Sequence, residues 1–174
     1  MSVEVIDNFL DNDDFIKLSS LICGNNFPWY SCKGITDEND GKFMFTHMLY
    51  EDGLPNSDFF NLFNETVLSK IFNMNKNKLI KISPLKMKLN LGTRTSEPEE
   101  TGFHLDVGAK NIPHNTGILY LNNNNGYTEF KNGQKINSVE NRAVLFDGLT
   151  SHRSVSQTDV PFRYVLNFNW LSLQ

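Results

Sequence analysis

The second half of the chain alternates apolar and polar residues along short segments, and this pattern constrains the fold more than any other feature. Along residues 85–91 the apolar positions are Leu85, Met87, Leu89 and Leu91, and the polar positions are Lys86, Lys88 and Asn90. Successive side chains of a strand point to opposite faces, so this segment predicts a half-buried strand with one apolar face for the helices. If the sheet curls, the polar face lines its interior.

Other segments supply further strands and two helices. The pattern predicts strands at 3–10, 117–121, 126–130, 143–146 and 162–170, and one or two more within the poorly patterned region 24–56. It predicts helices at 15–22, after Asp11–Asp14, and at 59–72, after Ser57 and Asp58, with a polar turn at 73–78. Apolar residues recur about every four positions in 59–72, which favours packing against a sheet. Two helices followed by many short strands indicate an α+β fold with a β-sandwich or jelly-roll core.

Length and charge limit the classes of function. The chain has 174 residues, enough for one domain spanning 1–174, and no linker divides it. Its net charge of −4 gives no general attraction to nucleic acid or to an anionic membrane, so we expect neither partner. The sequence shows no signal-peptide pattern and no apolar stretch of transmembrane length, which predicts a cytoplasmic protein, or one of the host cytoplasm if it is viral.

The two cysteines do not suggest a metal site or a disulfide. Cys23 and Cys32 form no C-x-x-C pair and belong to no cluster of Cys and His. We therefore expect two free, buried thiols in a reducing compartment.

A candidate metal site lies around His104 and Asp106. In an extended segment these two side chains project from the same face. His152, which follows an apolar strand that breaks at Gly148, is the third candidate. Two histidines and one carboxylate form the facial triad of non-haem Fe(II) oxygenases. An isolated H-x-D pair is a weak signal, so its neighbours in the sequence matter. We interpret His47 and His114 as structural or surface residues.

The last predicted strand carries an arginine on its polar face. Arg163 shares that face with Val165, Asn167 and Asn169, while the alternate residues are mainly apolar. Burying an arginine is costly unless it has an anionic partner, and a guanidinium group suits a carboxylate.

These motifs occur in a recognisable order. The order is His104-x-Asp106, the segment 117–122, Gly126-x-Thr128-x-Phe130, the segment 141–147, His152 and Arg163. With its motifs in this order, the chain resembles the Fe(II)/2-oxoglutarate-dependent dioxygenases, and among them the small prolyl-hydroxylase-like members of viral and bacterial type. The resemblance covers about the last ninety residues well.

The resemblance implies a fold, a reaction and a role for each residue. The fold would be a double-stranded β-helix (jelly-roll) core with the N-terminal helices packed on the major sheet. His104, Asp106 and His152 would bind Fe(II), Arg163 and Tyr120 would bind the distal carboxylate of 2-oxoglutarate, and Asn90 would be a further cosubstrate contact. The reaction would use O2, with ascorbate as a possible reductant, and would hydroxylate a substrate with release of succinate and CO2. Because Asp106 is present, halogenation is disfavoured.

Several alternatives stay open. The substrate could be a peptidyl prolyl or other side chain, or a small metabolite, and the oligomeric state cannot be read. A non-catalytic cupin-like binding module and a nucleobase oxygenase are the rival functions. Arg142 and Arg153 compete with Arg163, although Arg153 should point away from the metal. We interpret Lys86 and Lys88 as a solvated edge face. The loop 93–100 is either simply exposed or a lid over the site.

Overall fold

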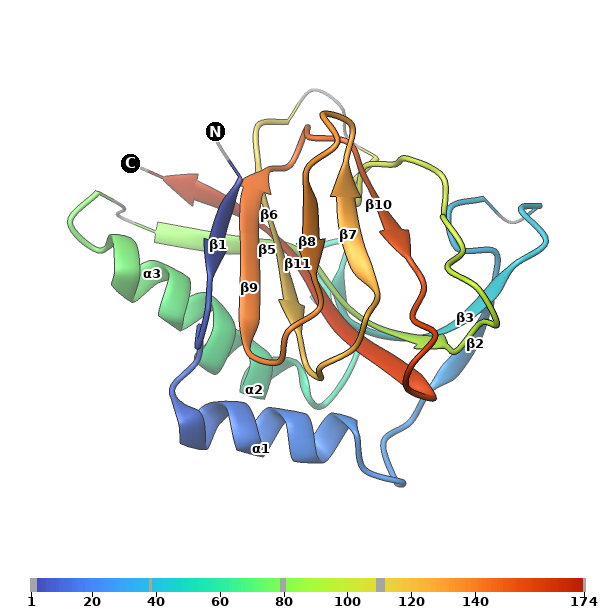
Figure 1. Ribbon diagram of the computed structural model, residues 1–174. Helices are drawn as coiled ribbons and strands as arrows, with labels where there is room; N and C mark the ends of the chain where they lie inside the picture. The colour runs from blue at the N-terminus through green and yellow to red at the C-terminus, as the bar shows by residue number, and fades with distance from the viewer. Residues whose placement is uncertain (1–2, 38, 79–80, 109–111, 174) are drawn as a thin grey trace.

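The computed structural model describes residues 3–37, 39–78, 81–108 and 112–173, and it consists mainly of β-strands with few helices (Figure 1). The strands are β1 (Glu4–Ile6), β2 (Tyr30–Lys33), β3 (Phe43–Glu51), β4 (Leu54–Pro55), β5 (Lys81–Thr93), β6 (Asn115–Tyr120), β7 (Tyr127–Phe130), β8 (Lys135–Asn137), β9 (Arg142–Asp147), β10 (His152–Val155) and β11 (Phe162–Leu173). The helices are α1 (Asn12–Ile22), α2 (Phe60–Phe63), the π-helix η1 (Asn64–Leu68) and α3 (Ser69–Asn75).

The strands form two antiparallel sheets. The large sheet has the order β1-β9-β6-β11-β5-β3-β2, with β4 paired to β3. The small sheet has the order β10-β7-β8. The predicted strands at 85–91, 117–121, 126–130, 143–146 and 162–170 are all confirmed, but the first strand stops at Ile6 rather than at residue 10.

The helices cover one face of the large sheet. The main apolar core joins Phe15, Leu18 and Ile22 of α1, and Phe63, Val67 and Ile71 of the second helical segment, to the large sheet through Met87, Leu89, Leu119, Leu166 and Phe168. Figure 1 shows the helices on the side of this sheet away from β7, β8 and β10. The apolar face predicted for β5 therefore packs on the helices.

The second predicted helix is confirmed, with two differences. It contains the π-helical segment η1, where the Thr66 hydroxyl donates a hydrogen bond of 2.8 Å to the Leu62 carbonyl. Such a back-bonding hydroxyl competes with the regular helical ladder. The helix also continues to Asn75, so the turn predicted from residue 73 begins too early.

The other face of the large sheet packs against the small sheet. A second apolar cluster joins Ile118, Tyr120, Val144, Phe146 and Val165 of the large sheet to Phe130 of β7 and Ile136 of β8. The two sheets thus enclose the space toward which the polar face of β5 points.

Two further expectations are wrong. Cys23 and Cys32 are free but exposed, not buried, because one follows the end of α1 and the other lies on the outermost strand β2. β5 is not an edge strand, since it lies between β11 and β3. In the part of the chain that the structure describes, no helix is long and apolar enough to cross a membrane.

Candidate active site

His104, Asp106 and His152 come together where the two sheets meet. One ligand atom from each residue lies within 4.8 Å of those of the other two. The Nε2 atoms of His104 and His152 lie 3.6 Å and 3.7 Å from Oδ1 of Asp106. This arrangement satisfies the geometry that the sequence pattern requires of a facial triad.

Both imidazoles are oriented by backbone carbonyls. Nδ1 of His104 lies 3.0 Å from the Gly102 carbonyl oxygen, and Nδ1 of His152 lies 3.3 Å from that of Thr150. A carbonyl only accepts hydrogen bonds, so each Nδ1 carries the proton and each Nε2 can offer a lone pair. This is the tautomer that a metal ion bound at Nε2 requires.

Asn167 supports the carboxylate. Its side-chain nitrogen donates to both oxygens of Asp106, at 3.2 Å and 3.3 Å. The sequence placed Asn167 on the same strand face as Arg163 but gave no sign of this contact. An outer amide of this kind fixes the orientation of a metal-binding carboxylate.

The three groups also set one another's protonation. Burial would raise the pKa of Asp106, but the adjacent His104 side chain and the nearby charges of His152, His104 and Lys88 lower it to about 2. Burial lowers the pKa of His152. For His104 burial acts in the same direction, but the adjacent Asp106 carboxylate and the hydrogen bond with Gly102 outweigh it and raise the pKa. Asp106 is therefore an anion at neutral pH, which suits a divalent cation.

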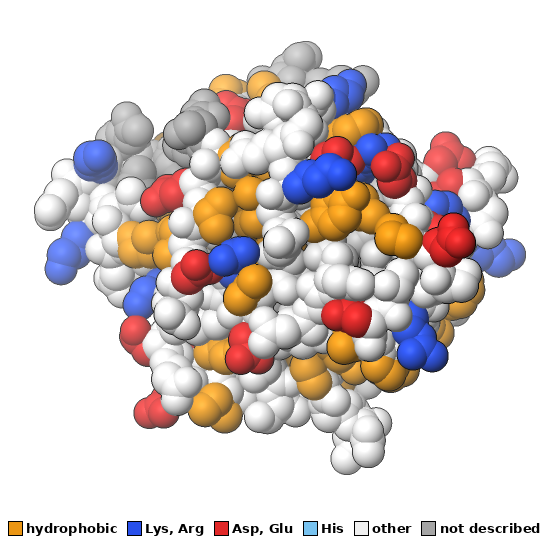
Figure 2. All heavy atoms as spheres, viewed as in Figure 1, with side chains coloured by type: hydrophobic (Ala, Val, Ile, Leu, Met, Phe, Trp, Pro, Cys, Tyr) orange, Lys and Arg blue, Asp and Glu red, His pale blue; other side chains and the backbone are white. Residues whose placement is uncertain are grey.

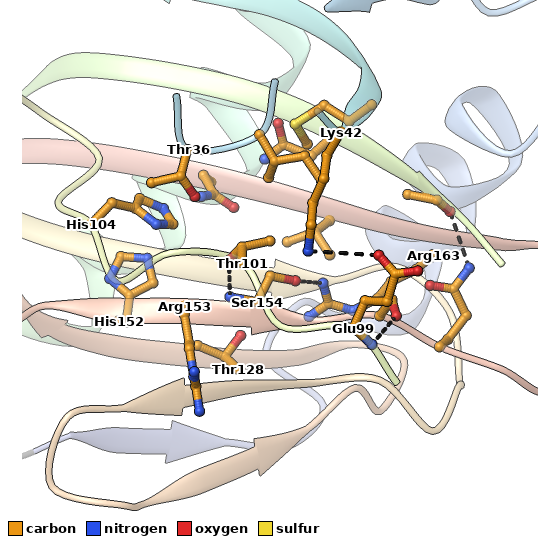
Figure 3. A pocket seen from close by; sticks show the side chains of 18 of the residues that line it. Thr36, Lys42, Glu99, Thr101, His104, Thr128, His152, Arg153, Ser154 and Arg163 are labelled. Carbon is orange, nitrogen blue, oxygen red and sulfur yellow. Dashed lines mark hydrogen bonds and ion pairs between the residues drawn. The ribbon is translucent and has the colours of Figure 1, made fainter. Parts of the chain in front are cut away.

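A cavity of about 590 Å³ opens beside the triad. Its wall includes residues of β5, β10 and β11, the segment 35–44 and the loop 93–100. Figure 3 shows the rings of His104 and His152 side by side, with Arg163 farther along the cavity beside Ser154. A volume of this size is ordinary for a small-molecule site.

Arg163 is buried at this cavity with only 8% of its surface exposed. Its Nε donates to the Ser138 hydroxyl at 2.8 Å, and one terminal nitrogen donates to the Ser154 hydroxyl at 2.7 Å. Among the described residues, no carboxylate forms an ion pair with it. Burial lowers its pKa, and the neighbouring Tyr120 opposes this. The guanidinium group is thus suited to an anionic ligand.

The two competing arginines are already paired with acids. Arg142 forms an ion pair with Asp7, and Arg153 pairs with Glu129 and Glu100. Arg153 does contribute to the cavity wall, but its charge is neutralised by these two acids. Arg163 differs from both, because no carboxylate of the described residues pairs with it.

Tyr120 lies behind the cavity wall. Its side chain is fully buried, and its hydroxyl lies within hydrogen-bond distance of the Thr128 hydroxyl at 2.8 Å and the Ile136 carbonyl at 3.3 Å. Thr128 lines the cavity, whereas Tyr120 does not. Thr128 thus connects Tyr120 to the cavity wall, a contact that sequence reasoning missed.

Asn90 lines the cavity near its middle, opposite Val165 in the pairing of β5 with β11. Its Oδ1 is buried and has no hydrogen-bond partner in the described part of the chain. A buried acceptor without a partner is costly, so Asn90 is placed to receive a hydrogen bond from a ligand or a water molecule.

His47 and His114 do not reach the triad. His47 is held by the Pro28 carbonyl and the Ser57 hydroxyl, both at 2.7 Å from its ring nitrogens. His114 is buried beside Gly148, where Nδ1 lies 2.8 Å from the Ile112 carbonyl. Both are structural residues. Thr95 and Glu99 of the loop 93–100 do line the cavity, and the loop is hydrogen-bonded to the segment 156–157.

Comparison with known proteins finds similar structures but no similar sequences. No protein-family model matches the sequence, and no curated protein matches it. Solved structures do match. A 2OG-Fe(II) oxygenase family oxidoreductase from Burkholderia pseudomallei superposes with a TM-score of 0.71 at 10% identity, over 97% of this chain and 84% of the other.

Two further structures show the range of similar proteins. A viral collagen prolyl hydroxylase from Paramecium Bursaria Chlorella virus-1, in a 2OG complex, superposes with a TM-score of 0.62 at 12% identity, over 100% of this chain and 97% of that one. The epimerase SnoN, in complex with Fe3+, alpha ketoglutarate and nogalamycin RO, gives 0.65 at 11% identity, over 97% and 78%. The chain therefore has the fold of the Fe(II)/2-oxoglutarate oxygenases, the prolyl hydroxylases among them.

Proposed function

We propose that this protein is an Fe(II)- and 2-oxoglutarate-dependent dioxygenase that hydroxylates its substrate. In this proposal residues 1–174 are one catalytic domain, and the two facing sheets are the core of a double-stranded β-helix. His104, Asp106 and His152 would bind Fe(II), and Arg163 would bind the distal carboxylate of 2-oxoglutarate.

One observation carries the proposal: a buried arginine that no carboxylate of the described residues pairs with shares a cavity with a His-Asp-His triad. The donor set is chemically suitable, because two neutral imidazoles and one carboxylate favour a divalent transition metal and leave other coordination positions open. The distal carboxylate of a dicarboxylate would complete the pairing of Arg163. Thr128 and Ser154 offer hydroxyl groups beside it.

The roles of the side chains follow from their positions. Bound Fe(II) and 2-oxoglutarate would supply the activation of O2, with one oxygen atom entering succinate, the other entering the substrate, and CO2 released. Asn167 keeps Asp106 oriented, while the carbonyls of Gly102 and Thr150 keep the two imidazoles in the required tautomer. Asn90 would donate to, or accept from, a bound ligand near the middle of the cavity.

The main rival is a non-catalytic cupin-like module that binds a metal or another ligand. Such a module has no need of Arg163, whose burial costs free energy unless an anion is bound. The second rival is a nucleobase oxygenase. On the face shown in Figure 2 acidic and basic side chains are interspersed, without an extended basic surface. This distribution gives no support to a nucleic-acid substrate.

The test is succinate formation from 2-oxoglutarate, measured with Fe(II), O2 and ascorbate as reductant, without added substrate and then with candidate substrates. The proposal expects slow, iron-dependent turnover that is lost in Asp106→Ala and in Arg163→Met. Lys135→Met, which removes an exposed cation that does not line the cavity, is the control for loss of charge. Turnover that does not differ between wild type and the two site variants would refute the proposal.

A further inference from the structure

Lys88 places an ammonium group in the same cavity. It lies on the inner face of β5, two residues before Asn90, and its half-buried side chain lines the cavity wall. Its charge acts on the site, because it helps to lower the pKa of Asp106 and opposes the rise in the pKa of His104. The expectation that Lys88 belongs to a solvated edge is therefore wrong.

Lys88 has no protein partner among the described residues, since neither an ion pair nor a hydrogen bond of its side chain is found there. Two nearby lysines differ. Lys86, on the same face, forms an ion pair with Glu51 at 2.6 Å, and Lys42 lies 3.6 Å from Glu99. Burial, together with the charge of Lys86, lowers the pKa of Lys88, although the charge of Asp106 partly opposes this. An ammonium group in such surroundings is costly unless an anion binds there.

The strand register separates Lys88 from Arg163. Along the pairing of β11 with β5, Arg163 lies opposite Gly92, and Asn167 lies opposite Lys88. At about 3.4 Å per residue, four residues of strand place the two positions roughly 13 Å apart. Asn167 holds Asp106, so Lys88 is at the triad end of the cavity and Arg163 is at the far end. Lys88 and Arg163 thus contribute cationic groups from two separate strand positions of the cavity wall.

The cavity wall as a whole is cationic, although the chain carries a net charge of −4. Its described residues include two acids, Glu99 and Asp106. Five cations line it, Lys42, Lys88, Arg94, Arg153 and Arg163, but Glu100 and Glu129 neutralise Arg153 and Lys42 lies 3.6 Å from Glu99. Lys88, Arg94 and Arg163 therefore remain against Asp106. Such a lining favours an anionic ligand and disfavours a cationic one.

We propose that the substrate carries an anionic group, a carboxylate or a phosphate, and that Lys88 binds this group beside the metal site. This inference rests on the proposed function, in which Arg163 is occupied by the cosubstrate. It narrows the substrate class to an organic acid, a phosphorylated metabolite, or a side chain with an anionic neighbour. A peptidyl prolyl group alone would leave Lys88 without a partner.

The test uses the zinc-loaded protein saturated with 2-oxoglutarate, because Zn(II) binds the same kinds of ligand without redox chemistry. Acetate, inorganic phosphate and neutral acetamide are titrated separately while amide NMR shifts are followed. We expect acetate or phosphate to bind saturably and acetamide to give no saturable shift. The anion that binds more tightly indicates whether the anionic group of the substrate is a carboxylate or a phosphate. In Lys88→Met the dissociation constant for that anion should rise about tenfold or more. Lys86→Met, the matched control, should bind like wild type.

Three results would overturn the inference. The first is that no anion binds saturably, and the second is that wild type and Lys88→Met bind the anion with equal affinity. The third is that Lys88→Met loses affinity for 2-oxoglutarate instead, which would assign Lys88 to the cosubstrate. Failure of zinc and 2-oxoglutarate to bind wild type would refute the proposed function instead. In that case, anion titration of the metal-free protein and its two variants still decides the role of Lys88.

Discussion

His104 and His152 are hydrogen-bonded to each other through their backbones as well as brought together at the candidate metal site. The N–H of His104 donates to the His152 carbonyl at 2.9 Å, the N–H of His152 donates to the His104 carbonyl at 3.2 Å, and the two ring centroids lie 4.9 Å apart. The backbone thus fixes the spacing of the two imidazoles before any metal binds. Such preorganisation lowers the cost of forming a metal site.

Loss of the amide that holds Asp106 should weaken metal binding. We expect Asn167→Ala to raise the dissociation constant for Zn(II) roughly tenfold, because outer hydrogen bonds of this kind typically affect metal affinity by that factor or more. Competition with a chromophoric chelator measures this dissociation constant. Asn169→Ala removes another amide from the same strand face, one that donates to Thr116, and should leave zinc affinity unchanged. Equal affinities for the Asn167→Ala variant and wild type would contradict this role.

Thr128 rather than Tyr120 should contact the cosubstrate. Removal of the Thr128 hydroxyl in Thr128→Val should raise the KM for 2-oxoglutarate about tenfold, since this hydroxyl lines the cavity. Tyr120→Phe should change that KM much less and should instead lower the free energy of unfolding by about 1 kcal/mol, because the Thr128 hydroxyl loses a buried partner. A larger effect on KM in Tyr120→Phe would mean that the tyrosine hydroxyl contacts the cosubstrate directly, as the sequence resemblance implies.

Lys88 should reduce stability in the metal-free protein. Its pKa in the folded state is below the ordinary value of 10.5, mainly because of burial, so the ammonium opposes folding whenever it is charged. The penalty is complete at pH values below the folded-state pKa and disappears as the pH rises from that pKa toward 10.5. Lys88→Met should therefore be more stable than wild type by on the order of 1 kcal/mol at pH 7, and the gain should shrink as the pH rises.

Urea denaturation of wild type and Lys88→Met, from pH 7 up to 10.5, measures this difference in stability. Lys86→Met is again the control. It removes an ammonium that Glu51 pairs and one of the charges that lower the pKa of Lys88, so any gain in stability should be smaller than that of Lys88→Met. A Lys88→Met variant less stable than wild type at pH 7 would show that the protein itself compensates the ammonium group.

Gly117 allows the close packing of β6 against the neighbouring strand. A Cβ atom at this position would lie 2.2 Å from the ring of Phe168 on β11. Phe168 is fully buried, so the clash cannot be relieved by moving the ring into solvent. Gly117→Ala should destabilise the fold by roughly 2–3 kcal/mol. Gly108→Ala, where no atom of the described residues lies within 4 Å of the added Cβ, should be close to neutral. Thermal unfolding of both variants tests the packing.

Periodicity predicted the features that depend on a single strand. The alternation in 85–91 and 162–170 placed Asn90, Arg163 and Asn167 on inner faces, and the structure places Asn90 and Arg163 at the cavity wall. Side-chain direction is a local property of an extended backbone, so one sequence is enough to infer it. The helices at 15–22 and 59–72 were predictable for the same reason.

Contacts between strands could not be predicted in this way. The Asn167–Asp106 bond, the Tyr120–Thr128 bond and the isolation of Lys88 all depend on sheet order and register. A single sequence does not specify which strand lies beside which. The interpretation of Lys88 as an edge residue failed for this reason, because β5 is interior. The exposure of Cys32 likewise depends on the position of β2 at the end of the sheet.

The most direct test of the account is an anaerobic titration of metal-free protein with Fe(II) and then with 2-oxoglutarate, recorded in the visible range. We predict a weak metal-to-ligand charge-transfer band that requires both additions, is absent in His104→Ala and is lost or weakened in Arg163→Met. Binding of Fe(II) without any band on addition of 2-oxoglutarate would contradict the enzyme assignment and favour a metal-binding module.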